Sequence, residues 1–337
     1  MIMKKTQKRT PFAPAIRLIV VLLCTSAAAP AQPTASTPIP AGAQIVFWMN
    51  AAQISQDSDL RASVLENSTV GHCLNLLSLD LAEIDRIVLF MPFDKSWVNG
   101  TKLIVPQALP KNGAIIITGS FDAKTAYQGF KAKGWKEISY SNKKLLWWSK
   151  GTSYYCDPKS GACIAQLPGG GLIAGGSEGA TKNVLDVAGG KAQSFAISPT
   201  FERLSQDFNF DKTRLLSLYV LITPDMRAIV KSDTSAIKSS TGKAAIGYID
   251  YLEETGLSVA RSGNGFGIEG YLGMDSESNS LIVSSIFQIG GGLASLLPPN
   301  DPNRSILENL SVSRQGKLVI LQSNLTRRQL QNLMRYK

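Results

Sequence analysis

Histidine is almost absent from this chain, which has a single one, His72, among its 337 residues. A nucleophilic serine needs a base, usually histidine, and a third group that orients the base. The chain matches the G-x-S-x-G pattern of serine hydrolases at 175–179, but its histidine precedes Ser177, whereas the hydrolase fold with this turn has its histidine last. The sequence therefore favours Ser177 as the N-cap of a helix that follows a strand, and a nucleophile is the alternative.

Metal-binding and phosphate-binding motifs are also missing. Asp57 and Asp59 are not followed by the glycine and glutamate of a calcium loop, so helix capping is the better interpretation. Gly169 and Gly171 lead into an apolar, strand-like run, whereas the glycines of a dinucleotide fingerprint follow a strand and open a helix. We therefore expect no metal and no cofactor.

An excess of positive charge is concentrated at the N-terminus. Residues 1–17 hold five of the 35 basic residues and none of the 25 acidic ones, so the remaining chain has 30 basic and 25 acidic residues and a net charge of +5. No run of Lys and Arg with interleaved aromatic residues is present. The charge therefore gives no support to a nucleic-acid partner.

The first 31 residues have the layout of a secretory signal peptide. A basic segment over 1–17 precedes an apolar run over 18–29, which is too short to span a bilayer, and Ala29 and Ala31 form a cleavage site of small residues. Cleavage near Ala31 predicts a periplasmic or secreted protein.

The chain has only four cysteines. Cys24 lies in the predicted signal peptide, and its lipidation is a competing interpretation that the large Leu23 before it disfavours. Cys156 and Cys163 bracket the turn-forming segment DPKSGA, so we expect them to form a disulfide in an oxidising compartment. Cys73 remains as a buried, apolar thiol.

The chain length exceeds that of a typical single domain. We expect a flexible lead-in over 32–43, a first α+β unit over 44–190, a connecting helix or linker over 191–212 and a second α+β unit over 213–337. Both units follow the order strand, helix, then two strand-strand-helix groups, so an internal duplication is a hypothesis. Hairpins outnumber parallel crossovers, which predicts an α+β fold of mostly antiparallel sheets covered by helices.

Three local patterns predict particular elements. Asp122 precedes a run with helical spacing and is expected to cap that helix. The SGNG sequence at 262–265 lies between two β-like runs and is the strongest hairpin signal in the chain. A further helix is predicted at 244–254.

Residues 280–299 form a run of twenty residues without charge. We expect a helix over 280–297 that packs on a sheet, in preference to membrane contact, because its large apolar residues share one helical face. The residues predicted to pack are Ile282, Ile286, Ile289, Leu293 and Leu296.

Aromatic residues are concentrated in one β-rich region. The sheet core is the favoured location for them, and an exposed platform that binds peptide or sugar is the alternative. These residues are Trp135, Trp147, Trp148, Tyr154 and Tyr155.

Two segments carry a resemblance. LAEIDRIVLF at 81–90 contains an Ile-Asp-x-Ile/Val strand, and the segment at 114–140 contains a Gly-x-Phe step from strand to helix and a helix that ends in glycine before a hairpin. In these features the chain resembles a loose group of uncharacterised exported bacterial proteins. The resemblance implies no activity and no catalytic residues.

Taken together, these patterns predict an exported, non-catalytic protein that acts as a binding or interaction module of the cell envelope. Its partner would be a protein, peptide or glycan. The alternative is a secreted hydrolase that uses Ser177 or a pair of carboxylates that meet in the fold.

Overall fold

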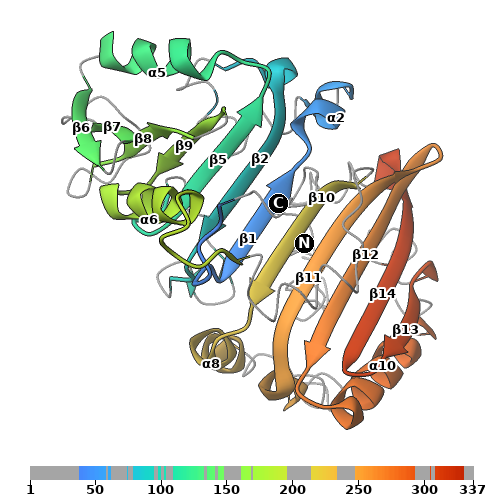
Figure 1. Cartoon of the computed structure of the whole chain (residues 1–337). Helices are drawn as coiled ribbons and strands as arrows, with labels where there is room; N and C mark the ends of the chain where they lie inside the picture. The colour runs from blue at the N-terminus through green and yellow to red at the C-terminus, as the bar shows by residue number, and fades with distance from the viewer. Residues whose placement is uncertain are drawn as a thin grey trace, which may run out of the picture.

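In the computed structural model of the chain, helices pack on both faces of one large antiparallel sheet (Figure 1). The predicted signal peptide lies outside the residues that the structure describes. These are residues 38–57, 60–61, 74, 79–94, 98–99, 102–103, 109–132, 135–140, 143–147, 161–167, 170–195, 214–233, 247–292, 304 and 308–329.

The first part of the chain supplies seven neighbouring strands of the twelve-stranded sheet. From the middle of the sheet outward they are β1 (Ile45–Met49), β2 (Ile84–Met91), β5 (Ala114–Gly119), β9 (Leu172–Gly175), β8 (Cys163–Gln166), β7 (Lys143–Trp147) and β6 (Lys136–Tyr140). Two short strands, β3 (Val98–Asn99) and β4 (Lys102–Leu103), pair separately.

The second part supplies the other five strands. From the middle outward they are β10 (Arg214–Leu221), β11 (Leu252–Ser262), β12 (Gly265–Met274), β14 (Leu318–Thr326) and β13 (Ser311–Gln315). β1 and β10 pair antiparallel from Ile45↔Val220 to Met49↔Leu216. The strands of both predicted α+β units therefore belong to one continuous sheet.

Helices cover both faces of the sheet. They are α2 (Ala51–Ser55), α5 (Ala123–Ala132), α6 (Glu178–Ala188), α8 (Pro224–Asp233) and α10 (Glu277–Gly292), with 3₁₀ turns η1 (Leu81–Glu83) and η5 (Tyr248–Tyr251). On β5, Ile115 and Ile117 join the core formed with α2 and α5, whereas Ile116 points to the opposite face and joins the core formed with α6. This double coverage explains why β5 is an unbroken apolar run.

The hairpin predicted at 262–265 is confirmed. β11 and β12 pair along their length and close at Ser262↔Gly265, with Gly263 at a φ of 53° in the turn.

The predicted capping role of Asp122 is also confirmed, because its Oδ1 accepts the Lys124 amide at 3.0 Å at the start of α5. The Thr125 hydroxyl also donates to Asp122, and this hydrogen bond lowers the pKa of the carboxyl.

The helix predicted at 244–254 is wrong from Tyr248 onward. Gly247 is helical, but Tyr248–Tyr251 form the 3₁₀ turn η5, and β11 begins at Leu252. β11 pairs with β10 on one side and β12 on the other, so ladder hydrogen bonds along both edges outweigh the local helical pattern.

Glycine allows Tyr271 to lie flat across the middle of the second half. Gly256 pairs with Tyr271 across β11 and β12, and a methyl group built on Gly256 would overlap the Tyr271 ring. Gly267 lies on the same face of β12 as Tyr271. The atom nearest to a methyl group built on Gly267 would be Asn324 Oδ1, at 3.6 Å. The two glycines therefore differ in the space available to a side chain.

We expect Gly256→Ala to lower the free energy of unfolding by about 1–3 kcal/mol, because the added methyl displaces a buried ring. Gly267→Ala is the matched control and should stay within about 1 kcal/mol of the parent chain. Urea denaturation measures both. Equal effects of the two substitutions would contradict the packing of Tyr271 on Gly256.

Candidate functional site: the α10–β13 surface

Ser177 is the N-cap of α6. Its backbone is extended, with φ −153° and ψ 167°, and its Oγ accepts the Ala180 amide at 3.2 Å. The side chain is buried. The interpretation of Ser177 as a helix cap is therefore confirmed, because its hydroxyl satisfies a donor in the first turn.

The turn around Ser177 is closely packed. The Thr181 hydroxyl lies within 3.2 Å of both the Ser177 and the Cys163 carbonyl oxygens. A methyl group on Gly175 would overlap Thr181, and one on Gly176 would overlap the Pro110 carbonyl. Close packing therefore requires Gly175, the first glycine of the hydrolase-like pattern, and its neighbour Gly176. The second glycine of the pattern, Gly179, has room for a methyl group, whose nearest atom would be Ser177 Oγ at 3.7 Å.

We expect Ser177→Ala to lower the free energy of unfolding by about 1 kcal/mol, because an amide of α6 loses its acceptor. Ser177→Asn is the matched control, since asparagine caps helices equally well. Thermal or urea unfolding provides the measurement. Wild-type stability of the alanine variant would argue against the cap.

The other predicted site residues divide into a core group and a group outside the described residues. Trp135 is 6% exposed and belongs to the core, so it is not part of an aromatic surface. Trp147 lies in β7, but its side chain is outside the described residues, as are Trp148, Tyr154 and Tyr155. Cys163 is buried in β8, and Cys156 is outside the described part, so the disulfide stays a prediction.

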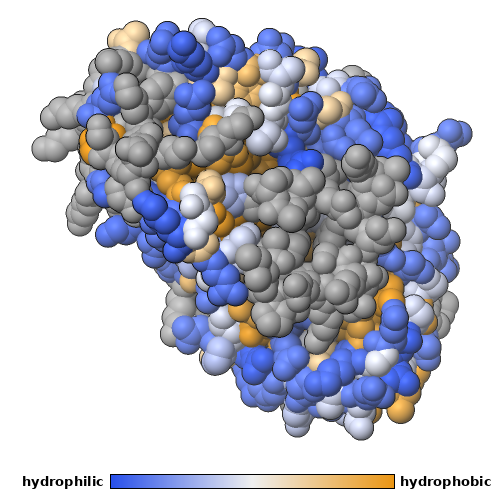
Figure 2. Space-filling model, viewed as in Figure 1, coloured by the Kyte–Doolittle hydropathy of each residue, from blue (hydrophilic) through white to orange (hydrophobic). Residues whose placement is uncertain are grey.

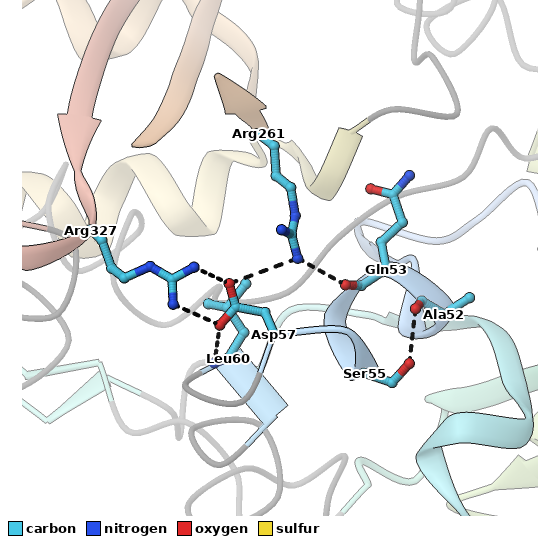
Figure 3. Close-up of polar contacts among 7 residues, drawn as sticks. All are labelled: Ala52, Gln53, Ser55, Asp57, Leu60, Arg261 and Arg327. Atoms are coloured by element: carbon cyan, nitrogen blue, oxygen red, sulfur yellow. Dashed lines mark hydrogen bonds and ion pairs between the residues drawn. The ribbon is translucent and has the colours of Figure 1, made fainter. Parts of the chain in front are cut away.

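Asp57 joins the two halves of the chain (Figure 3). Its Oδ1 accepts the Leu60 amide at 3.2 Å, as the capping interpretation predicts. Two arginines from the second half also reach its buried carboxylate. Arg327, directly after β14, lies at 2.6 Å and 3.3 Å, and Arg261, near the end of β11, lies at 3.7 Å. Sequence reasoning missed both arginines, because no local pattern links residues that are 204 and 270 positions apart.

The geometry indicates that Arg327 binds the Asp57 carboxylate more strongly than Arg261 does. Arg327 presents two guanidinium nitrogens to two carboxylate oxygens, whereas Arg261 divides its Nη2 between Asp57 and the Gln53 carbonyl at 3.2 Å. Both arginine side chains are about half exposed, which weakens their attraction by solvent screening. The cluster is therefore a structural tie between the halves.

In a double-mutant cycle, we expect a coupling of about 1–2 kcal/mol between Asp57→Ala and Arg327→Ala, because the bidentate pair has one buried partner. The matched cycle with Arg261→Ala should give less than about 0.5 kcal/mol. Both cycles use unfolding free energies from urea titrations. The reverse ranking would contradict the geometry.

The buried acids of the described residues do not form a carboxylate pair. They are Asp57 and Glu254. Arg261, which contacts Asp57, is seven residues from Glu254 along β11, which places the two carboxylates on the order of 20 Å apart. Paired catalytic carboxylates of glycosidases lie roughly 5–9 Å apart.

The structure corrects the packed face of α10. Its buried side chains include Ser280, Val283 and Ser284, whereas Ile282 is 40% and Ile289 is 64% exposed. The Ser280 hydroxyl donates to the Gly316 carbonyl in the turn between β13 and β14 at 2.7 Å. Small serines let the helix approach the sheet closely, so Leu281, Ile282 and Ile289 face outward, whereas Phe287 packs against the core. Of the other residues predicted to pack, Ile286 is half-buried, and Leu293 and Leu296 lie outside the described residues.

Exposed apolar side chains gather at this helix. Among the described residues, the exposed large hydrophobic side chains are Leu281 (54%), Ile282 and Ile289 of α10, and Tyr251 (41%) of η5, which contacts α10. Figure 2 shows single apolar residues among mostly hydrophilic ones at the end that carries α10, and further apolar areas over the first half. A concentration of large exposed apolar side chains, as on α10, marks an interaction site more often than scattered apolar residues do.

The outermost strand of the sheet lies beside this helix. Among the described residues, β13 pairs only with β14. Four of its five side chains are exposed, and α10 packs against β13, β14 and β12. We call the set of Leu281, Ile282, Ile289 and strand β13 the α10–β13 surface. A serine pattern at Ser280 and Ser284, four residues apart, could have indicated the packed side of α10.

Two further features bear on the site. Within the described residues, no group of three or more His, Cys, Asp or Glu side chains could hold a metal ion. None of the described helices is both long and apolar enough to cross a membrane.

Comparisons with protein families and with curated proteins find no match to the chain. Solved structures with detectable similarity include TP0453 in its crystal forms III, IV and I, with TM-scores of 0.48, 0.46 and 0.42. The sequence identities are 10%, 11% and 10%, and each alignment covers 89% of this chain and 95–96% of TP0453.

Proposed function

We propose that this protein is an exported, non-catalytic binding module of the cell envelope that engages its partner through the α10–β13 surface. The single observation that carries the proposal is the exposure of Leu281, Ile282 and Ile289 on a helix that borders an open sheet edge. Desolvating apolar side chains of this size favours association by roughly 25 cal/mol for each Å² removed from water.

The state of Ser177 supports a role without catalysis. Its hydroxyl is buried and accepts a helix amide, whereas a nucleophile must be open to substrate and to a base. A secreted hydrolase therefore remains the weaker alternative.

Export and duplication are further parts of the proposal. The basic and apolar segments of the first 31 residues support cleavage near Ala31 and a periplasmic or secreted location. The common order of the halves supports an internal duplication: β1, β2, β5, β9 and β8 follow one another outward as β10, β11, β12, β14 and β13 do, with helices after the first and third strands of each series.

Photocrosslinking in intact cells tests the binding surface. A photoreactive phenylalanine analogue in place of Ile289 should yield a crosslinked product of higher mass, because position 289 would lie in the interface. The matched control places the same analogue at Lys124, an exposed position on α5 in the other half. We expect the product from position 289 at least about tenfold above that from position 124.

Two outcomes would contradict the proposal. Equal or absent crosslinking at the two positions would remove the α10–β13 surface as a binding site. Covalent labelling by a fluorophosphonate that is lost in a folded Ser177→Ala variant would make the protein a serine hydrolase instead.

A further inference from the structure

The outer edge of β13 carries unpaired backbone groups at defined positions. The hairpin between β13 and β14 has the two-residue loop Gly316-Lys317 and closes at Gln315↔Leu318. In such a hairpin the closing pair is hydrogen-bonded, and hydrogen-bonded pairs alternate along the ladder. Ser311, Ser313 and Gln315 therefore bond to β14, while the N–H and C=O groups of Val312 and Arg314 point to the open edge.

In the first half of the chain, the edge that corresponds to the open edge of β13 is covered by another strand. β8 holds the place in its half that β13 holds in the second, because each pairs with the strand that follows it along the chain, β9 or β14. β8 is covered on its other edge by the antiparallel strand β7, and α5 packs against both β8 and β7. No described strand covers β13 in this way, which leaves α10 with exposed apolar residues.

We propose that the missing strand is β13 of a second copy of this chain, so that the protein forms a twofold symmetric dimer through its sheet edge. This inference rests on the proposed function, since it names the partner of the same surface. The dimer continues the sheet from one copy into the next, with α10 of both copies on the same face.

The sequence of β13 suits antiparallel pairing with itself. A twofold axis at Ser313 places Val312 opposite Arg314 of the second copy and Arg314 opposite its Val312. Each of these two pairs exchanges two N–H···O=C hydrogen bonds, so four bonds form from groups that are open in one copy. No like charges face one another, and β13 lacks the proline that often protects an edge.

The same pairing brings the two α10 helices together. Each helix packs over the last strands of its sheet, and neighbouring strands are about 4.8 Å apart. Because α10 packs over β13, β14 and β12, the two helices are then about two to three strand spacings apart, or roughly 10–14 Å, and the lower value is the usual distance between packed helices. The dimer therefore removes part of the exposed apolar surface of α10 from water.

Cysteine crosslinking tests the position of the axis. Residues that face each other in a non-hydrogen-bonded antiparallel pair have Cα atoms about 4.5 Å apart, within the range of a disulfide. We expect oxidised Ser313→Cys to run as a covalent dimer. Ser311→Cys is the matched control, because its two copies would be about 14 Å apart and should give less than about a tenth of that product.

Proline at the open edge tests the backbone bonds. Arg314→Pro removes an outward N–H without removing a bond to β14, whereas Arg314→Ala keeps that N–H. For the full chain, we expect sedimentation equilibrium to show a dimer whose dissociation constant rises at least about tenfold in the proline variant and less than about threefold in the alanine variant. Circular dichroism checks that both variants remain folded.

The outcomes separate this inference from the proposed function. A monomeric full chain at roughly 100 µM, or equal disulfide yields from Ser313→Cys and Ser311→Cys, would overturn the dimer. If position 289 then crosslinks to a different protein in cells, the binding surface stands and the second copy is excluded. If position 289 crosslinks to nothing, both proposals fail. If Arg314→Pro unfolds the chain, the comparison of Ser313→Cys with Ser311→Cys decides alone.

Discussion

The pairing of β1 with β10 is the contact on which the rest of the sheet depends. It is the join between the strands of the two halves, and its two largest buried side chains, Trp48 and Tyr219, are each about 1% exposed. Every other strand adds outward from this pair, on β2 in one direction and on β11 in the other. A change that separated β1 from β10 would divide the main sheet in two.

The two halves contribute unequal numbers of strands to the sheet, and this difference explains where large apolar residues are exposed. The first half extends four strands beyond β5, and its helix α5 finds strands to pack on out to β7. The second half ends two strands beyond β12, so α10 reaches the border of the sheet. The same arrangement thus places one helix over the interior of a wide sheet and the other at its edge, and the difference in strand number decides which helix exposes large apolar residues.

Local chemistry could be predicted from the sequence, and long-range packing could not. Asp122, Ser177 and the SGNG turn act on neighbours within a few residues, so their patterns were sufficient to predict two caps and a hairpin. The rotation of α10 was missed because apolar residues occur around the whole helix and only contact with β12, β13 and β14 selects the buried side. The edge position of β13 likewise depends on the strand order, which no local pattern contains.

The ion pair between Asp57 and Arg327 can form only late in the synthesis of the chain. Arg327 is added to the chain 270 residues after Asp57, which at a typical ribosomal rate is a delay of roughly 15–55 s. Until then the carboxylate has no bidentate partner, and its only described partner from the second half is the more distant Arg261. A chain that ended before Arg327 would therefore lack the bidentate ion pair that joins its two halves.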